Sequence, residues 1–165
     1  MSGKIRKDVP IKFFTSYSHK DEDIREELDV HLAVLRRHPA IEIWNDRAIQ
    51  VGQEWDEKIS NELNTADIIL LLVSPRFLAS KYIYDVEIKR AWERHKDPKD
   101  PVRLIPIIIK PCDWDEEQIA DIQAIPRDGI PVTEFDDLDE ILTKVVKEIR
   151  AVIPTVQEEK LSLNS

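Results

Sequence analysis

The stretch that decides the fold is LLLVSPRFLASKYIYDVEIKRAW, residues 70–92. It begins inside a continuous apolar run, residues 68–73, which is typical of a parallel strand buried on both faces. A turn then leads into a helix. At about 100° per residue, Glu87 falls between Ile83 and Ala91 on the apolar face of that helix. Because burying a bare charge is costly, a lone carboxylate on such a face must be paired, hydrogen-bonded or functional.

Further strands and helices alternate on both sides of this stretch. Apolar residues at helical spacing, such as Leu28, Leu32 and Leu35, predict the helices. The predicted strands are residues 11–17, 41–44, 68–74, 102–109 and 130–133, and a closing helix covers residues 136–153. Five strands joined by helices predict an α/β, flavodoxin-like parallel sheet in the order 2-1-3-4-5, with helices on both faces. Ligands of such sheets bind beyond the carboxyl ends of the strands, where Glu87 lies.

Four residues bear on the ends or the regularity of these elements. Ser18 and Asp21 resemble a capping pair that opens the first helix. Pro106 falls inside the fourth predicted strand, where proline is awkward because it has no N–H to donate. Pro154 follows the closing helix, so residues 154–165 are predicted to be a tail or a linker.

Composition limits the possible classes of protein. The 165 residues are enough for one domain, placed at residues 10–153 after an N-terminal tail of residues 1–9. The net charge of −9, from 24 basic and 33 acidic residues, argues against a general binder of nucleic acid or of anionic membranes. Cys112 is the only cysteine, so no internal disulfide can form, which fits a reducing compartment.

The sequence gives no sign of a membrane segment, a metal site or a bound cofactor. The N-terminus lacks the apolar region of a secretory signal, and the longest apolar run is too short to span a bilayer. We therefore expect a cytoplasmic protein. The four histidines are scattered, and with three glycines the chain has neither a Walker loop nor a dinucleotide fingerprint. We expect no metal and no cofactor.

Four boxes of sequence occur in order at domain spacing. The first is FFTSYSHKD, residues 13–21, and the second is WNDRAIQVG, residues 44–52, followed by Trp55. The third runs over residues 66–87, and the fourth contains IPII at residues 105–108, with PV at residues 131–132. Together these boxes resemble Toll/interleukin-1 receptor (TIR) domains, in particular bacterial ones, over roughly residues 10–153.

The resemblance implies an activity. TIR domains with a glutamate at the position of Glu87 are commonly NAD+ glycohydrolases, which cleave the bond between nicotinamide and ribose. NAD+ would be a substrate, and the product would be ADP-ribose or a cyclic isomer. The role implied is bacterial antiphage defence or immune signalling. TIR relatives also commonly self-associate head to tail, through the loop that corresponds to residues 46–55 here. A fused or separate effector domain is a further candidate partner.

The chemistry of this bond suits a single carboxylate. Nicotinamide leaves as a neutral molecule, so the difficult step is to stabilise an oxocarbenium-like ribose. Glu87 is therefore the predicted catalytic residue. The alternative reading of Glu87 is a salt bridge with Arg90 or Arg94.

The predicted substrate-binding residues lie at the ends of strands, in the loop after the second strand, or on the helix that carries Glu87. Trp44 and Trp55 could stack on nicotinamide or adenine, although a tryptophan at such a position is more often part of the core. Ser18 is more simply a helix cap. The full set is Phe14, Ser16, Tyr17, His19, Trp44, Asp46, Arg47, Ile49, Trp55, Ser74, Tyr82 and Tyr84.

Three other functions compete with this interpretation. A response-regulator receiver would suit Asp21 and Lys110, but it needs a phosphoacceptor aspartate where this chain has Ser74. A nucleoside deoxyribosyltransferase shares the fold type and a lone glutamate, but it gives no reason for the loop over residues 46–55. A non-catalytic TIR adaptor that acts through self-association remains an alternative.

Overall fold

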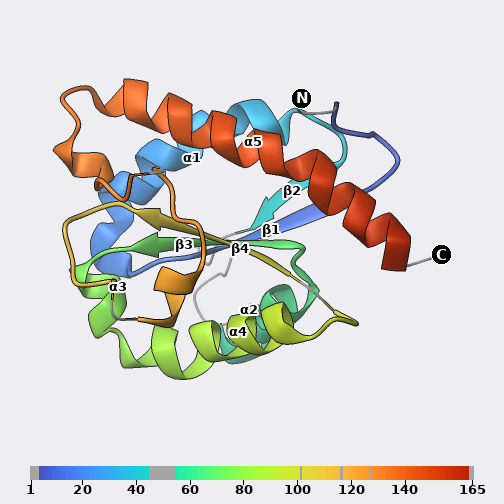
Figure 1. Ribbon diagram of the computed structural model, residues 1–165, viewed down its shortest axis with the longest axis horizontal. Helices are drawn as coiled ribbons and strands as arrows, with labels where there is room; N and C mark the ends of the chain where they lie inside the picture. Colours follow the sequence, from blue (N-terminus) through green and yellow to red (C-terminus); the bar gives the residue numbers. More distant parts are fainter. Residues whose placement is uncertain (1–3, 45–54, 101, 116, 127, 164–165) are drawn as a thin grey trace.

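The computed structural model describes residues 4–44, 55–100, 102–115, 117–126 and 128–163, without the side chains of residues 55–58 and 118. The described residues form a four-stranded parallel sheet in the order β2-β1-β3-β4 (Figure 1). This confirms four of the five predicted strands and their order. The strands are β1 (Ile11–Ser16), β2 (Ile41–Trp44), β3 (Ile68–Val73) and β4 (Arg103–Ile108).

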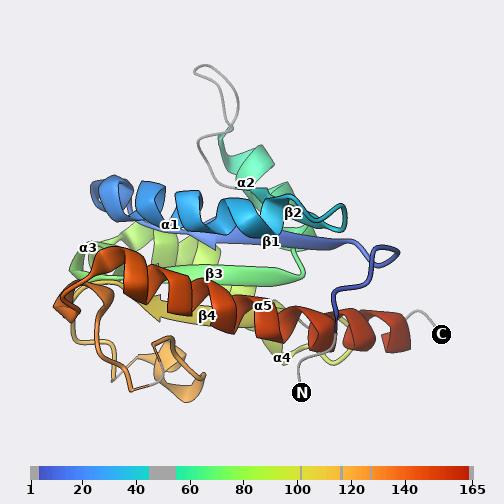
Figure 2. The ribbon, with the colours of Figure 1, turned by 90° about the horizontal axis from the view of Figure 1, so that it is seen from above.

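Helices cover both faces of the sheet, as predicted. Figures 1 and 2 show α1 and α5 on one face, with α2 and α4 on the other. The helices of at least one full turn are α1 (Glu22–Arg36), α2 (Trp55–Thr65), α3 (Pro75–Ala79), the π-helical η3 (Ile83–Ile88), α4 (Lys89–Lys96) and α5 (Leu138–Leu163). Short 3₁₀ turns are η1 (His19–Asp21), η4 (Gln118–Asp121) and η5 (Val132–Glu134).

Two hydrophobic clusters lie on the two faces of the sheet. Successive side chains of a strand point to opposite faces. Phe13 therefore packs with the cluster that contains Leu28 of α1 and Ile149 of α5, whereas Phe14 packs with Leu63 of α2 and Ala91 of α4. All six residues of β3 are buried, as its continuous apolar sequence predicted.

The predicted fifth strand, residues 130–133, is wrong. Val132 to Glu134 form the 3₁₀ turn η5, preceded by Pro131 at its N-cap. Proline cannot donate to a strand ladder, and here it starts the turn that Glu134 closes by donating its N–H to the carbonyl of Pro131 (2.9 Å). Val132 is still fully buried in the core, so its apolar character reflects burial without strand formation.

The edge position of β4 explains how the strand accommodates Pro106. The outer side of β4 pairs only with residue 125 among the described residues, through an isolated bridge between Ile107 and Ile125. Ile125 donates its N–H to the carbonyl of Pro106 (2.8 Å) and accepts from the N–H of Ile108 (2.9 Å). The backbone of Pro106 thus faces the outer edge of the sheet. The N–H that proline lacks would point away from β3, so no hydrogen bond between β3 and β4 is lost.

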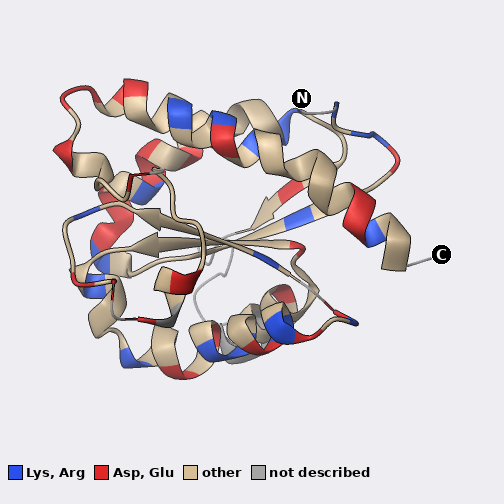
Figure 3. Ribbon diagram, viewed as in Figure 1, with Lys and Arg blue, Asp and Glu red and all other residues tan. Residues whose placement is uncertain are grey.

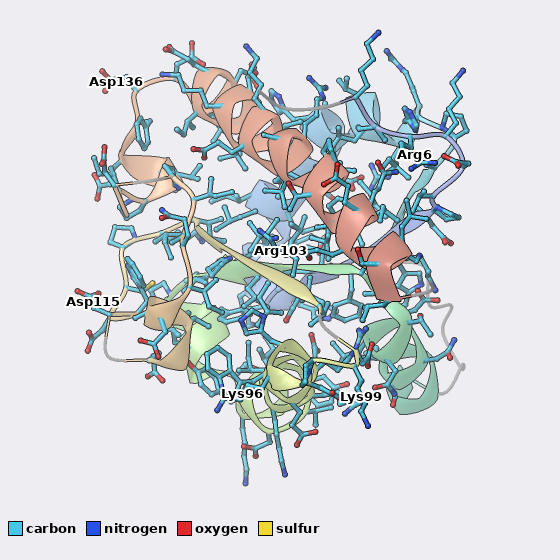
Figure 4. All side chains as sticks on the ribbon, turned by 45° about the vertical axis from the view of Figure 1, so that its right-hand side comes forward. Arg6, Lys96, Lys99, Arg103, Asp115 and Asp136 are labelled. Atoms are coloured by element: carbon cyan, nitrogen blue, oxygen red, sulfur yellow. The ribbon has the colours of Figure 1, made fainter. Side chains whose placement is uncertain are left out.

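Helix α5 extends ten residues beyond the predicted end at Ile153, through Pro154 to Leu163. The added turns are held by tertiary contacts. Gln157 is fully buried, and its amide donates to the carbonyls of Arg6 (2.9 Å) and Val9 (2.8 Å) and accepts from the N–H of Arg6 (2.9 Å). Arg6 is labelled beside this part of α5 in Figure 4. These bonds offset the helical hydrogen bond that Pro154 cannot make.

We predict that Gln157→Leu lowers the free energy of unfolding by about 1–3 kcal/mol, because it leaves buried backbone groups of the N-terminal segment without partners. Chemical denaturation measures the change. Thr155→Ala, an exposed position on the same helix, is the matched control and is expected to have little effect. Equal stability of Gln157→Leu and the wild type would contradict the prediction.

Candidate functional site

Glu87 lies in the π-helical turn η3, and its side chain is only 7% exposed. In a regular α-helix, Ile83 and Ile88 would point about 140° apart. The wider π turn buries both of them in the cluster that faces α2 and α4. Single π turns inside helices occur frequently at functional sites. The turn thus directs Glu87 inward together with two core residues, in agreement with its predicted place on an apolar face.

The segment between β3 and Glu87 is fixed by side-chain caps. Ser74 caps α3, because its Oγ accepts a hydrogen bond from the N–H of Phe77 (3.0 Å). Phe77 itself is fully buried. Ser80 repeats the pattern, since its Oγ accepts from the N–H of Ile83 at the start of η3 (3.2 Å). The position of Glu87 is therefore determined stepwise from the carboxyl end of β3.

The two arginines that could have paired with Glu87 bind other groups. Arg94 is buried and donates to both carboxylate oxygens of Asp100 (3.0 Å each) and to two backbone carbonyls at the end of α2. The hydrogen bonds from Arg94 lower the pKa of Asp100. Arg90 donates to the side chain of Asn64. These contacts attach α4 to α2.

Three of the predicted binding residues lie on the same face of the sheet as Glu87. Phe14 is buried, and its ring stacks on Trp44 with ring centroids 5.3 Å apart. Ser16, two residues after Phe14, points to the same face. Its hydroxyl is buried and has no hydrogen-bond partner among the described residues. Because a buried polar group without a partner is unfavourable, Ser16 is a candidate for contact with a ligand.

Three other predicted residues lie toward the opposite face or its rim. Tyr17 is buried in the cluster beneath α1, and its hydroxyl donates to the carboxylate of Glu22 (2.8 Å). His19 is exposed and stacks on the ring of Tyr17 at 5.6 Å. Ser74 also faces this side, where it meets Asp21. These residues share one end of the sheet with Glu87, but they belong to a separate cluster.

The remaining predicted residues fall on η3, at its N-cap or outside the described part of the chain. Tyr82 is 38% exposed, whereas Tyr84 is half-buried, and burial together with a hydrogen bond to Glu117 raises the pKa of Tyr84. Burial also raises the pKa of the Cys112 thiol to about 11. Asp46, Arg47 and Ile49 lie outside the described residues, and so does the side chain of Trp55, although this residue begins α2.

Sequence reasoning missed a buried polar cluster centred on Asp21. Asp21 is 1% exposed; its carboxylate accepts from the hydroxyl of Ser74 (2.5 Å) and from Nζ of Lys110 (2.9 Å). The cluster thus links the segments that follow β1, β3 and β4. The predicted capping pair was half right. Ser18 caps η1 by accepting from the N–H of Lys20, but Asp21 makes no side-chain cap. The sequence pattern that could have indicated this cluster is a carboxylate and a lysine that follow different strands, Asp21 after β1 and Lys110 after β4.

Acidic residues surround this end of the sheet. Figure 3 shows Asp and Glu on the loops at the left, where the strands end, and Figure 4 labels Asp115 and Asp136 there. The two carboxylates Asp113 and Asp115 contribute, after burial, to the raised pKa of Cys112. Carboxylates around a site stabilise positive charge that develops on a bound molecule.

A groove of about 800 Å³ lies away from this end, along the outer edge of β4. Leu104, Ile105 and Val152 contribute apolar lining, and the ion pair between Arg103 and Glu159 (3.1 Å) borders it. Arg103 is labelled on β4 in Figure 4. Glu87 does not line this groove, so it is separate from the candidate site.

A family model described as TIR domain matches residues 13–142, which is most of the chain. The chain belongs to the TIR domain family. A similar protein is the uncharacterized protein y4lF of Sinorhizobium fredii, which is 46% identical over 142 residues. The match covers 86% of this TIR chain and 43% of that relative, so the chain spans less than half of the relative's length. None of the helices that the structure describes is long and apolar enough to cross a membrane.

We predict that Lys110→Met destabilises the TIR domain by about 2 kcal/mol, because it leaves the buried Asp21 carboxylate without its cation. The loss is below that of a fully buried pair because the lysine side chain is 37% exposed. Urea denaturation measures it. Adding Asp21→Asn to Lys110→Met is expected to recover part of the stability, since the amide carries no charge. A double variant less stable than Lys110→Met would count against this account.

Proposed function

We propose that this TIR domain cleaves NAD+ between nicotinamide and ribose, with Glu87 as the catalytic carboxylate. The observation that supports this most directly is the buried position of Glu87 in a π turn beyond the end of β3. The TIR family includes NAD+-cleaving enzymes, and open α/β sheets bind ligands at this edge. In this proposal NAD+ is the substrate, and no further cofactor is needed.

A single buried carboxylate is sufficient for this bond cleavage. The nicotinamide ring carries a positive charge in NAD+ and leaves as a neutral molecule, so no acid has to protonate it. Positive charge develops on the ribose instead, and the carboxylate of Glu87 stabilises it electrostatically. The low exposure of Glu87 strengthens this effect, because charge interactions are stronger away from water.

Neighbouring groups on the same face would bind the substrate. The hydroxyl of Ser16, which has no hydrogen-bond partner among the described residues, is suited to a hydroxyl or amide of NAD+. Trp44 is half-buried and stacks on Phe14, so its outer ring face is the surface on which a nicotinamide or adenine ring would lie. Tyr17, His19 and Ser74 belong to the other cluster, and we assign them a smaller part in binding.

The same proposal extends to the role of the protein in the cell. We propose a role in antiphage defence or immune signalling in the bacterial cytoplasm, as the resemblance to bacterial TIR domains implies. The product is ADP-ribose if water reaches the ribose and a cyclic isomer if the adenine of the same molecule does. An effector domain, fused or separate, would respond to that product or control its formation.

We predict that Glu87→Gln lowers the rate of nicotinamide release from NAD+ by at least about a hundredfold, because the neutral amide cannot stabilise the oxocarbenium-like ribose. Chromatographic detection of nicotinamide measures the rate. The matched control is Glu93→Gln, an exposed carboxylate on the following helix, which should retain full activity. A Glu87→Gln variant that melts like the wild type and keeps its rate would refute the assignment.

The alternative function is a non-catalytic scaffold that works through self-association. The scaffold and the enzyme are separated by one measurement, because a scaffold releases no nicotinamide at any protein concentration. We favour the enzyme because a scaffold gives no reason to bury a carboxylate at the ligand-binding edge of the sheet.

We also propose that catalysis depends on self-association through the loop over residues 46–55. This proposal rests on sequence, since residues 46–54 of the loop lie outside the described residues. The loop is long for a connection in a compact α/β domain and carries the apolar residues Ile49 and Val51 without strand or helix periodicity. Such side chains are more stable against a partner than in water.

We predict that specific activity rises with protein concentration, because the loop of one protomer completes the site of the next. A dilution series with NAD+ tests this. Ile49→Asp should flatten the rise without changing the melting temperature, since it removes an apolar contact between protomers. Constant specific activity over a wide range, with a monomer in light scattering throughout, would mean that one chain holds the complete site.

A further inference from the structure

The outer edge of β4 has a gap in its backbone hydrogen bonding. In a parallel sheet, alternate residues of a strand direct their N–H and C=O groups to opposite neighbours. The N–H groups of Arg103 and Ile109 donate to carbonyls in residues 67–73, on the β3 side (3.1 and 2.9 Å). The odd-numbered residues of β4 therefore pair with β3. The even-numbered residues, among them Leu104, direct their backbone groups to the outer edge.

Leu104 lies between two positions whose outward carbonyls are already bonded. On one side, the carbonyl of Val102 accepts from Nδ1 of His95 (3.0 Å). On the other, the carbonyl of Pro106 accepts from the N–H of Ile125 (2.8 Å). Neither the N–H nor the C=O of Leu104 has a hydrogen-bond partner in the part of the chain that the structure describes. Because Leu104 is only 3% exposed, this donor and acceptor lie away from bulk water, which is unfavourable.

Leu104 is one of the residues that line the groove of about 800 Å³ along this edge. The two walls of the groove belong to different layers of the fold. Val152 on α5 packs against the cluster beneath α1 and α5, whereas Ile122 packs against the cluster beneath α2 and α4. The groove is thus a slot that continues the plane of the sheet, with the edge of β4 as its floor.

A planar ring fits this slot. Placed in the plane of the sheet, the ring presents its edge to the backbone of Leu104 and its two faces to Val152 and Ile122. An added peptide strand does not fit, because it needs the outward groups on either side of Leu104. Pro106 has no N–H, and the carbonyls of Val102 and Pro106 are taken. The volume of the groove is in the range of sites for small molecules.

The charges around the groove favour a ligand without net charge. The carboxylates that line it are Asp121, Glu148 and Glu159, and the Lys and Arg side chains are Lys147 and Arg103. Arg103 already pairs with Glu159 (3.1 Å). Carboxylates thus outnumber these cations, so the groove would repel a phosphate group.

We propose that this groove binds adenosine through the edge of its adenine ring. The amino group of adenine donates to the carbonyl of Leu104, and the adjacent ring nitrogen accepts from the N–H of the same residue. Two fused rings cover more of the apolar walls than the single ring of cytosine or nicotinamide, which carry similar edges. The ribose hydroxyls donate to Asp121 and Glu159, which are exposed beside the groove.

This site is independent of the proposed cleavage of NAD+. Glu87 and Ser16 do not line the groove, and adenosine has no bond to nicotinamide. Glu87→Gln should therefore bind adenosine within about twofold of the wild type, whether or not the domain cleaves NAD+. Loss of adenosine binding in Glu87→Gln would place the nucleoside at the end of the sheet that carries Glu87 and would overturn the groove site.

Calorimetric titration of the whole chain with adenosine tests the proposal. We expect a dissociation constant below about 1 mM, raised at least about tenfold by Ala151→Trp, because the indole fills the groove. Ala151 lines the groove and is exposed, so this variant should melt like the wild type. The matched control is Lys144→Trp, an exposed position about two turns earlier on α5 and outside the groove lining, which should bind normally. No binding at about 1 mM, or equal loss in both variants, would overturn the proposal.

Related ligands test the hydrogen-bonding edge and the charge. Purine riboside lacks the amino group and should bind at least about fivefold more weakly than adenosine, since the carbonyl of Leu104 stays without a partner. AMP should also bind more weakly than adenosine, because its phosphate meets the carboxylates around the groove. Tighter binding of AMP, cytidine or nicotinamide than of adenosine would overturn the assigned ligand.

The amide of Leu104 gives a direct reading of the contact. Hydrogen exchange followed by NMR should show that adenosine slows the exchange of the Leu104 N–H at least about fivefold, because the bound ring accepts from it. The N–H of Ile105, which faces β3, is the internal control and should change little. Unchanged exchange at Leu104 with saturating adenosine would overturn the backbone contact.

Discussion

The complete burial of β3 is the constraint on which the rest of the structure depends. Its six residues are apolar, and none is more than 1% exposed, so both faces of the sheet must be covered by helices. α1 and α5 cover one face, and α2 and α4 cover the other. Ser74 ends the strand and caps α3, which fixes the direction of the chain toward Glu87. The same strand thus determines the core and the position of the candidate site.

The two faces of the sheet separate the polar groups at its carboxyl end. Glu87 and Ser16 lie with the α2 and α4 cluster, whereas Asp21 and Tyr17 lie beneath α1. In our proposal the first pair contacts the ligand, which the buried Ser16 hydroxyl without a partner among the described residues supports. In the second group the carboxylate of Asp21 is matched by Lys110, which suits a structural role. In that proposal, one end of the sheet holds a reactive group and a stabilising cluster side by side.

Several features of the fold were predictable because they depend on short stretches of sequence. The limits of β2 and the buried run of β3 follow from local periodicity and turn residues. The fifth strand and the end of α5 could not be predicted in this way. Val132 is buried without joining the sheet, and α5 continues past Pro154 because Gln157 binds the N-terminal segment. In both cases contacts between distant residues outweigh local preference.

The sequence by itself determined the α/β class, the family and the presence of one carboxylate on an apolar helix face. These properties follow from residue order, because side-chain periodicity is a local quantity. Only the tertiary structure decided that Glu87 sits in a π turn, that Ser16 shares its face and that Asp21 binds Lys110, a residue 89 positions away in the chain. The physical reason is that burial and pairing depend on which strands and helices pack together, and no local pattern encodes the distance between residues on separate strands.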